Sequence, residues 1–241
     1  RMFVARDKDG TRQPITGGMT IAVDPVSFGR MVLFGTGRFL TDADPGDESV
    51  QSLYGLIDDG KAITKGREEL TQRKIVAETT TTNGLDVRTF DPASSTIGDE
   101  KRGWYMDLID PTAGAEGERV FGQPRNEAGV LLLSSGIPSG DPCDPNGTGF
   151  VYALNAFTGA SLSQQYWDTN NDGKVDGQDN VNNTTAGAIG HKNMLTDSLT
   201  LQGNDGHGEV YSGDFGAGGK GLGNKSLMTT GRISWRELLG E

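Results

Sequence analysis

The segment from Asp168 to Asp179 carries residue types and a spacing that suit the binding of a divalent cation. Acidic and amide side chains fall at positions 1, 3, 5, 9 and 12 of this segment. Position 6 is a glycine, and position 7 can contribute its main-chain carbonyl whatever its side chain. This order of residues is that of an EF-hand calcium loop. The predicted calcium ligands are Asp168, Asn170, Asp172, the carbonyl of Lys174, Asp176 and Asp179.

Calcium is the cation that this pattern favours. It takes six to eight oxygen ligands at about 2.3–2.6 Å, whereas magnesium prefers to keep its own waters. Side chains at alternating positions converge as the main chain curls, and Gly173 permits the sharp turn. The four carboxylates of the segment repel one another until a cation neutralises them. We therefore expect Ca²⁺ to order this loop, with Val175 and Trp167 holding it against the core.

Two features depart from a standard EF-hand. Position 12 is Asp179 rather than glutamate, so this shorter side chain is expected to coordinate poorly or through water, and the loop effectively ends at Asp176. Residues 159–165 and 180–187 lack helical periodicity, which predicts an EF-hand-like loop between strands. Two other interpretations stay open: a solvated turn cluster without metal, and a weak calcium site whose role is purely structural.

The elements around the loop are predicted to be strands. The chain has 37 glycines, and 34% of its residues are hydrophobic. Short apolar runs separated by Gly, Asp, Asn and Thr favour an all-β fold with many tight turns. Residues 67–74 are the exception, because they are rich in Glu, Leu, Gln and Lys and are expected to form a short helix in a loop.

A short aromatic and apolar pattern recurs along the chain. Three copies lie at 52–58, 103–110 and 149–155, and a weaker copy lies at 208–214. The tyrosines of the first three copies are 51 and 47 residues apart. Chance similarity between hairpins is one explanation, and a repeat of about fifty residues is the other.

A second pattern supports the repeat. Residues 32–37 resemble residues 131–136, which lie 99 residues later. Repeats of about 40 to 50 residues built of short strands are typical of propeller blades, whose inner strands are buried on both faces. The sequence therefore predicts a partial or modified β-propeller. At about fifty residues per blade, residues 1–241 would form one domain with four to five blades, which is expected to be either an incomplete ring or a fragment of a longer chain.

Charge and hydropathy exclude several partners. The chain has 22 basic and 33 acidic residues, a formal charge of −11, and no basic stripe, which argues against nucleic acid as a partner. No run of 18 apolar residues occurs, so no helix is expected to span a membrane. Cys143 is the only cysteine and has no partner for an internal disulfide. Sparse cysteine and an acidic surface suit an extracellular setting and divalent cations.

Five stretches together resemble the PilY-type proteins, which are tip-associated adhesins and biogenesis factors of type IV pili. In family order these stretches are FGTGRFL at 34–40, QSLYG at 51–55, KRGWYMDL at 101–108 with GERV at 117–120, DPC at 141–143 with ALNAFTG at 153–159, and TGRISWREL at 230–238. The resemblance implies that residues 1–241 are the C-terminal part of a modified seven-bladed propeller. It also implies a calcium loop of the form D-x-[ND]-x-D-G-x-x-D, which matches the segment that begins at Asp168.

The resemblance carries functional expectations. PilY-type proteins act in pilus biogenesis, twitching motility and surface adhesion, and their calcium-loaded state opposes pilus retraction. The implied location is the cell surface and pilus tip, reached through the periplasm and outer membrane. The implied partners are the minor pilins of the pilus tip and the host-cell surface, with Ca²⁺ as the cofactor and no enzymatic activity. No Arg-Gly-Asp tripeptide occurs, so integrin binding through that motif has no support.

The main alternative is an enzyme. Residues 153–159 also resemble the blade motif of quinone-dependent dehydrogenases, which would make the fold quinoprotein-like and the protein a periplasmic dehydrogenase with pyrroloquinoline quinone and calcium. No catalytic acid or cofactor-stacking tryptophan can be assigned for it. Residues 218–226 lack the glycine that a phosphate-binding loop places before Lys-Ser. His191 and His207 accompany no nucleophile or zinc motif and are expected to be ordinary loop residues.

Overall fold

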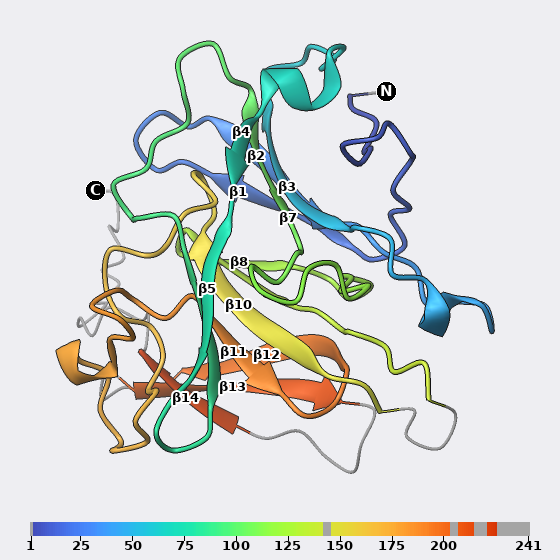
Figure 1. Cartoon of the computed structure of the whole chain (residues 1–241). Coiled ribbons are helices and arrows are strands. Elements are labelled where there is room, and N and C mark those ends of the chain that lie inside the picture. Colours follow the sequence, from blue (N-terminus) through green and yellow to red (C-terminus); the bar gives the residue numbers. More distant parts are fainter. Residues whose placement is uncertain (1, 142–145, 203–206, 215–220, 226–241) are drawn as a thin grey trace, which may run out of the picture.

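Three β-sheets stacked face to face make up the fold (Figure 1). The computed structural model describes residues 2–141, 146–202, 207–214 and 221–225, and within them the predicted all-β class is confirmed. The helical elements of these residues are three short 3-10 turns, η1 (Asp44–Gly46), η2 (Gly66–Glu69) and η3 (Gly177–Asp179). The strands of these residues close no ring or barrel.

The strands of each sheet come from separate parts of the chain. In spatial order, the first sheet consists of β1 (Met19–Val23), β2 (Arg30–Gly35), β3 (Ser52–Asp58), β7 (Gly103–Asp107) and β4 (Thr71–Arg73). The second consists of β5 (Ile75–Thr80), β6 (Asp86–Phe90), β11 (Ala188–His191), β10 (Gly149–Asn155), β9 (Val130–Ser134) and β8 (Arg125–Glu127). The third consists of β12 (Leu195–Gln202), β13 (His207–Asp214) and β14 (Gly221–Lys225). Neighbouring strands are antiparallel, except that β4 runs parallel to β7.

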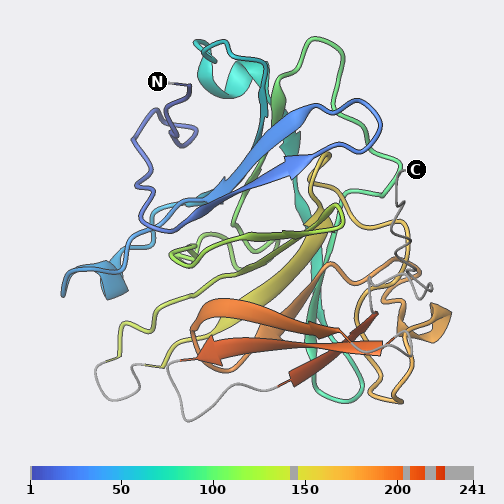
Figure 2. The ribbon, with the colours of Figure 1, turned by 180° about the vertical axis from the view of Figure 1, so that it is seen from behind.

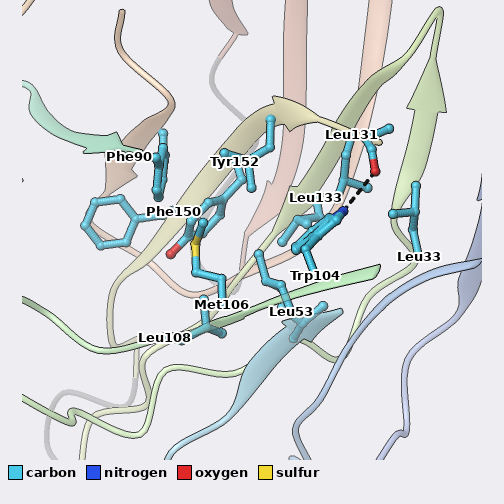
Figure 3. Close-up of a cluster of buried hydrophobic side chains, with 14 of the residues drawn as sticks. Leu33, Leu53, Phe90, Trp104, Met106, Leu108, Leu131, Leu133, Phe150 and Tyr152 are labelled. Atoms are coloured by element: carbon cyan, nitrogen blue, oxygen red, sulfur yellow. Dashed lines mark hydrogen bonds between the residues drawn. The ribbon is translucent and has the colours of Figure 1, made fainter. Parts of the chain in front are cut away.

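The central strands of the second sheet are buried on both faces. One face packs against the first sheet, where Leu53 belongs to the same apolar cluster as Leu133 and Tyr152 (Figure 3). The opposite face packs against the third sheet, where Val151 and Val210 share another cluster. All of β9 and nearly all of β10 are therefore buried. Burial on both sides explains why these strands read as continuous apolar runs in the sequence.

Trp104 joins the first two sheets. Its indole is fully buried between Gly55 of β3 and Gly159, and an added methyl group at either glycine would lie 2.3 Å from the ring. The indole Nε1 donates a hydrogen bond of 3.1 Å to the carbonyl of Ala156 (Figure 3). The run at 153–159 is thus the end of β10 and the following turn, which pack against the tryptophan of the neighbouring sheet.

A buried network of charged side chains lies on the same face of the second sheet. Arg88 of β6 is fully buried, forms an ion pair with Glu118, and donates a hydrogen bond of 2.7 Å from Nη1 to the Tyr152 hydroxyl. That hydroxyl donates in turn to Glu118 over 2.6 Å, and Glu78 pairs with Nε of Arg88 at 2.7 Å. The guanidinium also lies 3.6 Å over the ring of Phe150. Burial raises the pKa of the Tyr152 phenol well above its usual value.

The first two sheets take their strands alternately from the chain. β1 to β4 enter the first sheet, β5 and β6 enter the second, and β7 then returns to the first. Only Lys74 separates β4 from β5, so one extended segment passes from one sheet to the next (Figure 1). This arrangement differs from the expected blades, each of which would be one contiguous piece of chain.

The predicted repeat of about fifty residues does not correspond to one sheet per copy. Tyr54 of β3 and Tyr105 of β7 lie directly opposite each other, so the first two copies are neighbouring strands of one sheet. The offset of 99 residues, by contrast, does relate equivalent elements. β2 pairs with β3 in the first sheet, and β9 pairs with β10 in the same way in the second. Tyr152 of β10 lies 98 residues after Tyr54 of β3. The unit that repeats at this spacing is therefore a whole sheet rather than a single strand.

The expected helix at 67–74 is wrong. Its beginning belongs to the 3-10 turn η2, and its end is the strand β4, which pairs with β7. Arg73 is buried in β4 and donates hydrogen bonds of 2.7 and 2.8 Å to the carbonyls of Thr158 and Thr96. Pairing with the sheet has overridden a modest helix propensity.

Several residues singled out in the sequence lie outside the described part of the chain. They are Cys143, Trp235, residues 218–220 and 226 of the glycine-rich segment, and all of residues 230–238. Among the described residues, no helix has the length and apolar character needed to cross a membrane.

Candidate calcium-binding loop

The predicted calcium loop connects β10 to β11 and lies at the opposite end of the molecule from the N-terminus (Figures 1 and 2). Trp167, just before the loop, is fully buried and packs edge-on against Tyr166, with ring centroids 4.9 Å apart. The amide of Asp168 donates a hydrogen bond of 3.0 Å to the carbonyl of Gly223 in β14. The start of the loop is therefore fixed to the third sheet, as the position of the tryptophan predicted.

The first half of the loop curls around its own acidic and amide side chains. The amide of Asp172 donates to Oδ1 of Asn170 over 2.9 Å and to Oδ1 of Asp168 over 3.3 Å. The amide of Gly173 donates to the other carboxylate oxygen of Asp168 over 3.0 Å. The side chains at positions 1 and 3 thus converge on the amide of position 5. Gly173, with a φ of 82°, supplies the turn that the sequence predicted.

The later positions of the loop are arranged differently. The amide of Lys174 donates to the Asp172 carboxylate over 2.8 Å, and the side chain of Lys174 is exposed. Asp176 is also exposed and caps the turn η3 by accepting a hydrogen bond of 2.8 Å from the amide of Gln178. Val175 is only half-buried, so its hold on the core is weaker than the sequence suggested.

Asp179 is fully buried and joins the two ends of the loop. Its Oδ1 accepts hydrogen bonds of 2.7 and 3.2 Å from the amides of Thr169 and Asn170, and its Oδ2 accepts one of 2.9 Å from the amide of Asp176. Both carboxylate oxygens are therefore engaged by the main chain. The position-12 residue therefore acts as a clasp, because it joins the two ends of the loop through hydrogen bonds. This structural role is compatible with the weak metal coordination expected of Asp179.

Two contributors to the site gave no signal in the sequence. Thr169 is buried, and its hydroxyl donates to the Asp179 carbonyl over 2.8 Å. Asn83, in the turn between β5 and β6, donates from its side chain to the carbonyl of Thr169 over 3.0 Å. These contacts tie the loop to a distant hairpin. No sequence pattern links residues 86 positions apart, so only the fold could reveal them.

The oxygen ligands of the loop suit a hard cation such as Ca²⁺, but only some of them are positioned to bind one. Asp168 and Asn170 already share one side of the curl, whereas the carboxylates of Asp172 and Asp176 are exposed. Within the described ranges, no three Asp, Glu, His or Cys side chains are gathered as a metal site would require. Binding of Ca²⁺ would therefore need the exposed carboxylates to turn inward. Asp179 fits the part of a clasp better than that of a direct ligand, since its oxygens are both engaged.

Comparison with known proteins identifies relatives over nearly the whole chain, although no family model matches. A type IV pilus biogenesis factor PilY1 homologue of Xylella fastidiosa (strain Temecula1) is 38% identical over 236 residues, which cover 95% of this chain and 18% of the relative. The type IV pilus biogenesis factor PilY1 of Pseudomonas aeruginosa (strain UCBPP-PA14) is 28% identical over 261 residues, covering 98% of this chain and 22% of the relative. The chain therefore spans about a fifth of the length of these proteins, which are named as biogenesis factors rather than enzymes.

A solved structure shares the fold. The crystal structure of the Pseudomonas aeruginosa PilY1 C-terminal domain matches with a TM-score of 0.77 and 23% sequence identity. The match covers 93% of this chain and 47% of that domain, and at this identity it bears on the fold alone. The sequence relatives and the shared fold agree with the five motifs found in the sequence. The chain belongs to the family of the PilY1-type type IV pilus biogenesis factors.

Proposed function

We propose that this chain serves type IV pilus biogenesis as part of a non-enzymatic protein of the cell surface or periplasm. The observation that carries the proposal is the 38% identity to a PilY1 homologue along 236 residues, which leaves almost no part of the chain unmatched. The proposed partners are the minor pilins at the pilus tip, and surface adhesion and twitching motility are the proposed consequences. The larger proteins in which such a chain occurs would supply the remaining contacts.

The second part of the proposal is that the loop at 168–179 binds Ca²⁺. The proposed ligands are Asp168, Asn170, Asp172, the carbonyl of Lys174 and Asp176, with Asp179 closing the loop from behind. Support comes from the oxygen-only donor set and from the curl that already brings Asp168 and Asn170 to one amide. Bound calcium would supply the positive charge that these carboxylates lack.

The position of the loop suggests what calcium would change. The loop contacts the third sheet through Gly223 and the β5–β6 turn through Asn83. Calcium would hold the carboxylates inward and stiffen a segment whose exposed side chains otherwise bond only to their own main chain. We propose that this stiffening stabilises the surface formed by the second and third sheets, and that the loaded state opposes pilus retraction.

The architecture of the longer protein is the third part of the proposal. Three sheets stack face to face, and the central strands of the middle one are buried on both sides, as blades are in a propeller. We propose that each sheet acts as a blade of a modified, quinoprotein-like propeller whose remaining blades come from other parts of the protein. A structure of a full-length relative, showing these sheets outside any radial arrangement, would contradict this proposal.

The experiment uses full-length protein in a piliated bacterium that lacks its own copy. Wild type, Asp172→Ala and the control Asp42→Ala, which removes an exposed aspartate outside the loop, are compared for sheared surface pilin and twitching zones. Restored pili with wild type support the biogenesis role, and failure to restore them opposes it. Loss of twitching with Asp172→Ala alone supports a regulatory calcium site.

Calorimetric titration separates the calcium proposal from the biogenesis proposal. Wild type and Asp42→Ala should bind Ca²⁺ at or below about millimolar concentration, and Asp172→Ala should bind it much more weakly. If wild type binds none at millimolar concentration, the calcium site is wrong whatever the pilus assay shows. If binding is lost but twitching is normal, the site is structural.

A further inference from the structure

Figure 1 shows the N-terminal segment and the chain around η2 at the same end of the molecule. A groove lined by both segments lies on the side of the first sheet that faces away from the second. Its volume is about 630 Å³. Its lining is part apolar and part charged, and consists of Met2, Val4, Arg6, Arg12, Ala62, Ile63, Thr64, Lys65, Gly66 and Glu68. The groove is remote from the calcium loop, and nothing in the proposed function uses it.

The groove is basic although the chain as a whole is acidic. Arg6, Arg12 and Lys65 line it against the single carboxylate of Glu68, within a chain of formal charge −11. These three cations are exposed, and none forms an ion pair with any part of the chain that the structure describes. Neighbouring cations do find partners, as Arg67 does with Asp107 at 2.8 Å. The charge of Lys65 acts on the nearby Glu69 carboxylate and helps to lower its pKa, whereas Arg6 and Arg12 have no ion-pair partner among the described residues.

Two of these cations face each other directly. Arg6 and Arg12 are opposite partners in an antiparallel bridge of the N-terminal hairpin. Like charges directly opposite one another on paired strands are destabilising. Arg6 also donates from its guanidinium to the carbonyl of Gly10 in the turn, and the Asp7 carboxylate closes the same turn by accepting from the amide of Thr11 over 2.8 Å. No hydrogen bond within the described hairpin uses the side chain of Arg12. A bound anion would turn this repulsion into two favourable contacts.

The walls of the groove are held in place by the core. The Tyr54 hydroxyl donates to the carbonyl of Arg6 over 3.1 Å, which fixes the hairpin to β3. Gln13 is buried beside Arg12, and its side-chain amide donates to Ser52 over 2.8 Å. On the other wall, the amide of Ile63 donates to the carbonyl of Met2 over 2.8 Å. The main chain that carries the cations is thus preorganised, which reduces the entropy lost on binding.

We propose that this groove binds an acidic peptide segment of a partner protein. The paired arginines and Lys65 would contact carboxylates, and arginine favours planar two-point contacts with such groups. Met2, Val4 and Ile63 would cover apolar side chains between the carboxylates. The volume of about 630 Å³ and the mixed lining of the groove fit a peptide better than a small inorganic anion, and the net charge of −11 opposes a long polyanion.

The test measures fluorescence polarisation of a labelled peptide of about eight alternating glutamate and leucine residues, against a lysine–leucine peptide of the same length. Wild type should bind the acidic peptide and not the basic one. The double variant Arg6→Ala/Arg12→Ala should weaken binding about fivefold to tenfold, and Lys65→Ala less. The matched control Lys74→Ala/Arg125→Ala, which removes two exposed cations elsewhere, should leave binding unchanged.

A stability measurement accompanies the binding assay. Arg12→Gln should raise the thermal midpoint of the free protein by about 1–3 °C, because it relieves the repulsion with Arg6. A lowered midpoint would mean that the pair stabilises the fold and is no binding device. Equal loss of peptide binding in the matched control would show a nonspecific charge effect and overturn the proposal. Tighter, arginine-dependent binding of an acidic polysaccharide such as polygalacturonate would overturn the peptide assignment.

Discussion

The buried network around Arg88 and the loop at 168–179 differ in how their charged side chains find partners. In the network, Arg88 meets Glu118 and Tyr152, which lie 30 and 64 residues away along the chain. In the loop, Asp168 and Asp172 bond to amides at most five residues away. Arg88, Glu118 and Tyr152 of the network are buried between the sheets. The carboxylates of Asp172 and Asp176 in the loop are exposed to water.

The difference indicates where each region obtains its stability. Charges that are buried must find opposite charges, so the network can exist only in the folded arrangement of the sheets and helps to specify it. Charges in the loop need no distant partner, because water and local amides satisfy them. Such a segment can therefore respond to an added cation without disturbing the core. Four predictions test this division, from the largest expected effect to the smallest.

Removal of one charge from the network should have the largest effect. Glu118→Ala leaves the buried guanidinium of Arg88 without its main counter-charge and should lower the free energy of unfolding by about 3–5 kcal/mol, measured by urea denaturation. The control is Glu78→Ala, because the Glu78 side chain is 30% exposed and water can replace it at Arg88. Similar losses for the two variants would show that the network does not depend on burial.

Asp179 should behave like the network although it belongs to the loop. Asp179→Ala leaves the buried amide of Thr169 and the partly buried amides of Asn170 and Asp176 without their acceptor, which should cost about 2–3 kcal/mol in calcium-free buffer. Asp179→Asn keeps an acceptor oxygen and should lose less. A calcium-free loss below about 0.5 kcal/mol for Asp179→Ala would mean that the clasp is dispensable.

Asp172 should show the opposite behaviour, with an effect only when calcium is present. Without calcium, Asp172→Ala should change stability by less than about 0.5 kcal/mol, since the side chain is exposed. With calcium at about ten times its dissociation constant, wild type should gain about 1.4 kcal/mol that the variant lacks. Thermal melts with calcium and with chelator give both numbers. Equal calcium gains in the two proteins would remove Asp172 from the ligands.

Asp44 combines features of both regions and should produce the smallest effect. It is buried, yet its partners are local: Oδ2 accepts from the amides of Leu40 and Thr41 over 2.6 and 2.8 Å, and Arg38 pairs with Oδ1 at 2.8 Å. The Leu40 amide is the main reason that the pKa of this carboxyl lies well below its usual value of 3.8. Its stabilising contribution is present above that usual value and is lost as the pH falls below it.

The variant Asp44→Asn should therefore be less stable than wild type at pH 7. The difference should shrink as the pH is lowered from about 5 to about 2, because the Asp44 carboxyl of the unfolded wild-type chain takes up a proton near its usual pKa, whereas the folded carboxylate, with its lowered pKa, does not. Urea midpoints across this pH range provide the measurement. A difference that stays constant with pH would show that the Asp44 charge does not matter.

Local patterns predicted local structure well. The apolar and aromatic runs at 52–58, 103–107 and 149–155 are β3, β7 and β10, and the glycine at position 6 forms the loop turn as expected. Short runs with turn residues between them suffice for strands, since the tendency is carried by neighbouring residues. The family resemblance rested on such runs and is confirmed by the relatives.

Sheet membership could not be predicted in the same way. Nothing in the sequence shows that Tyr54 faces Tyr105, because strand pairing joins residues about fifty positions apart. The helix expected at 67–74 failed for the same reason: the pairing of β4 with β7 lies outside the window that propensity describes. The clasp role of Asp179 and the Arg88 network are equally long-range. The calcium ligands themselves stay a prediction.

The place of the short strand β11 bears on how the protein is made. It lies between β6 and β10, so the hairpin β5–β6 cannot join the rest of the second sheet until residues 188–191 are available. While roughly a hundred further residues are synthesised, β6 would have an unpaired edge, a condition that favours aggregation. Assembly of the second sheet would then be late and cooperative, and the exposed edge of β6 would need shielding until β11 is available.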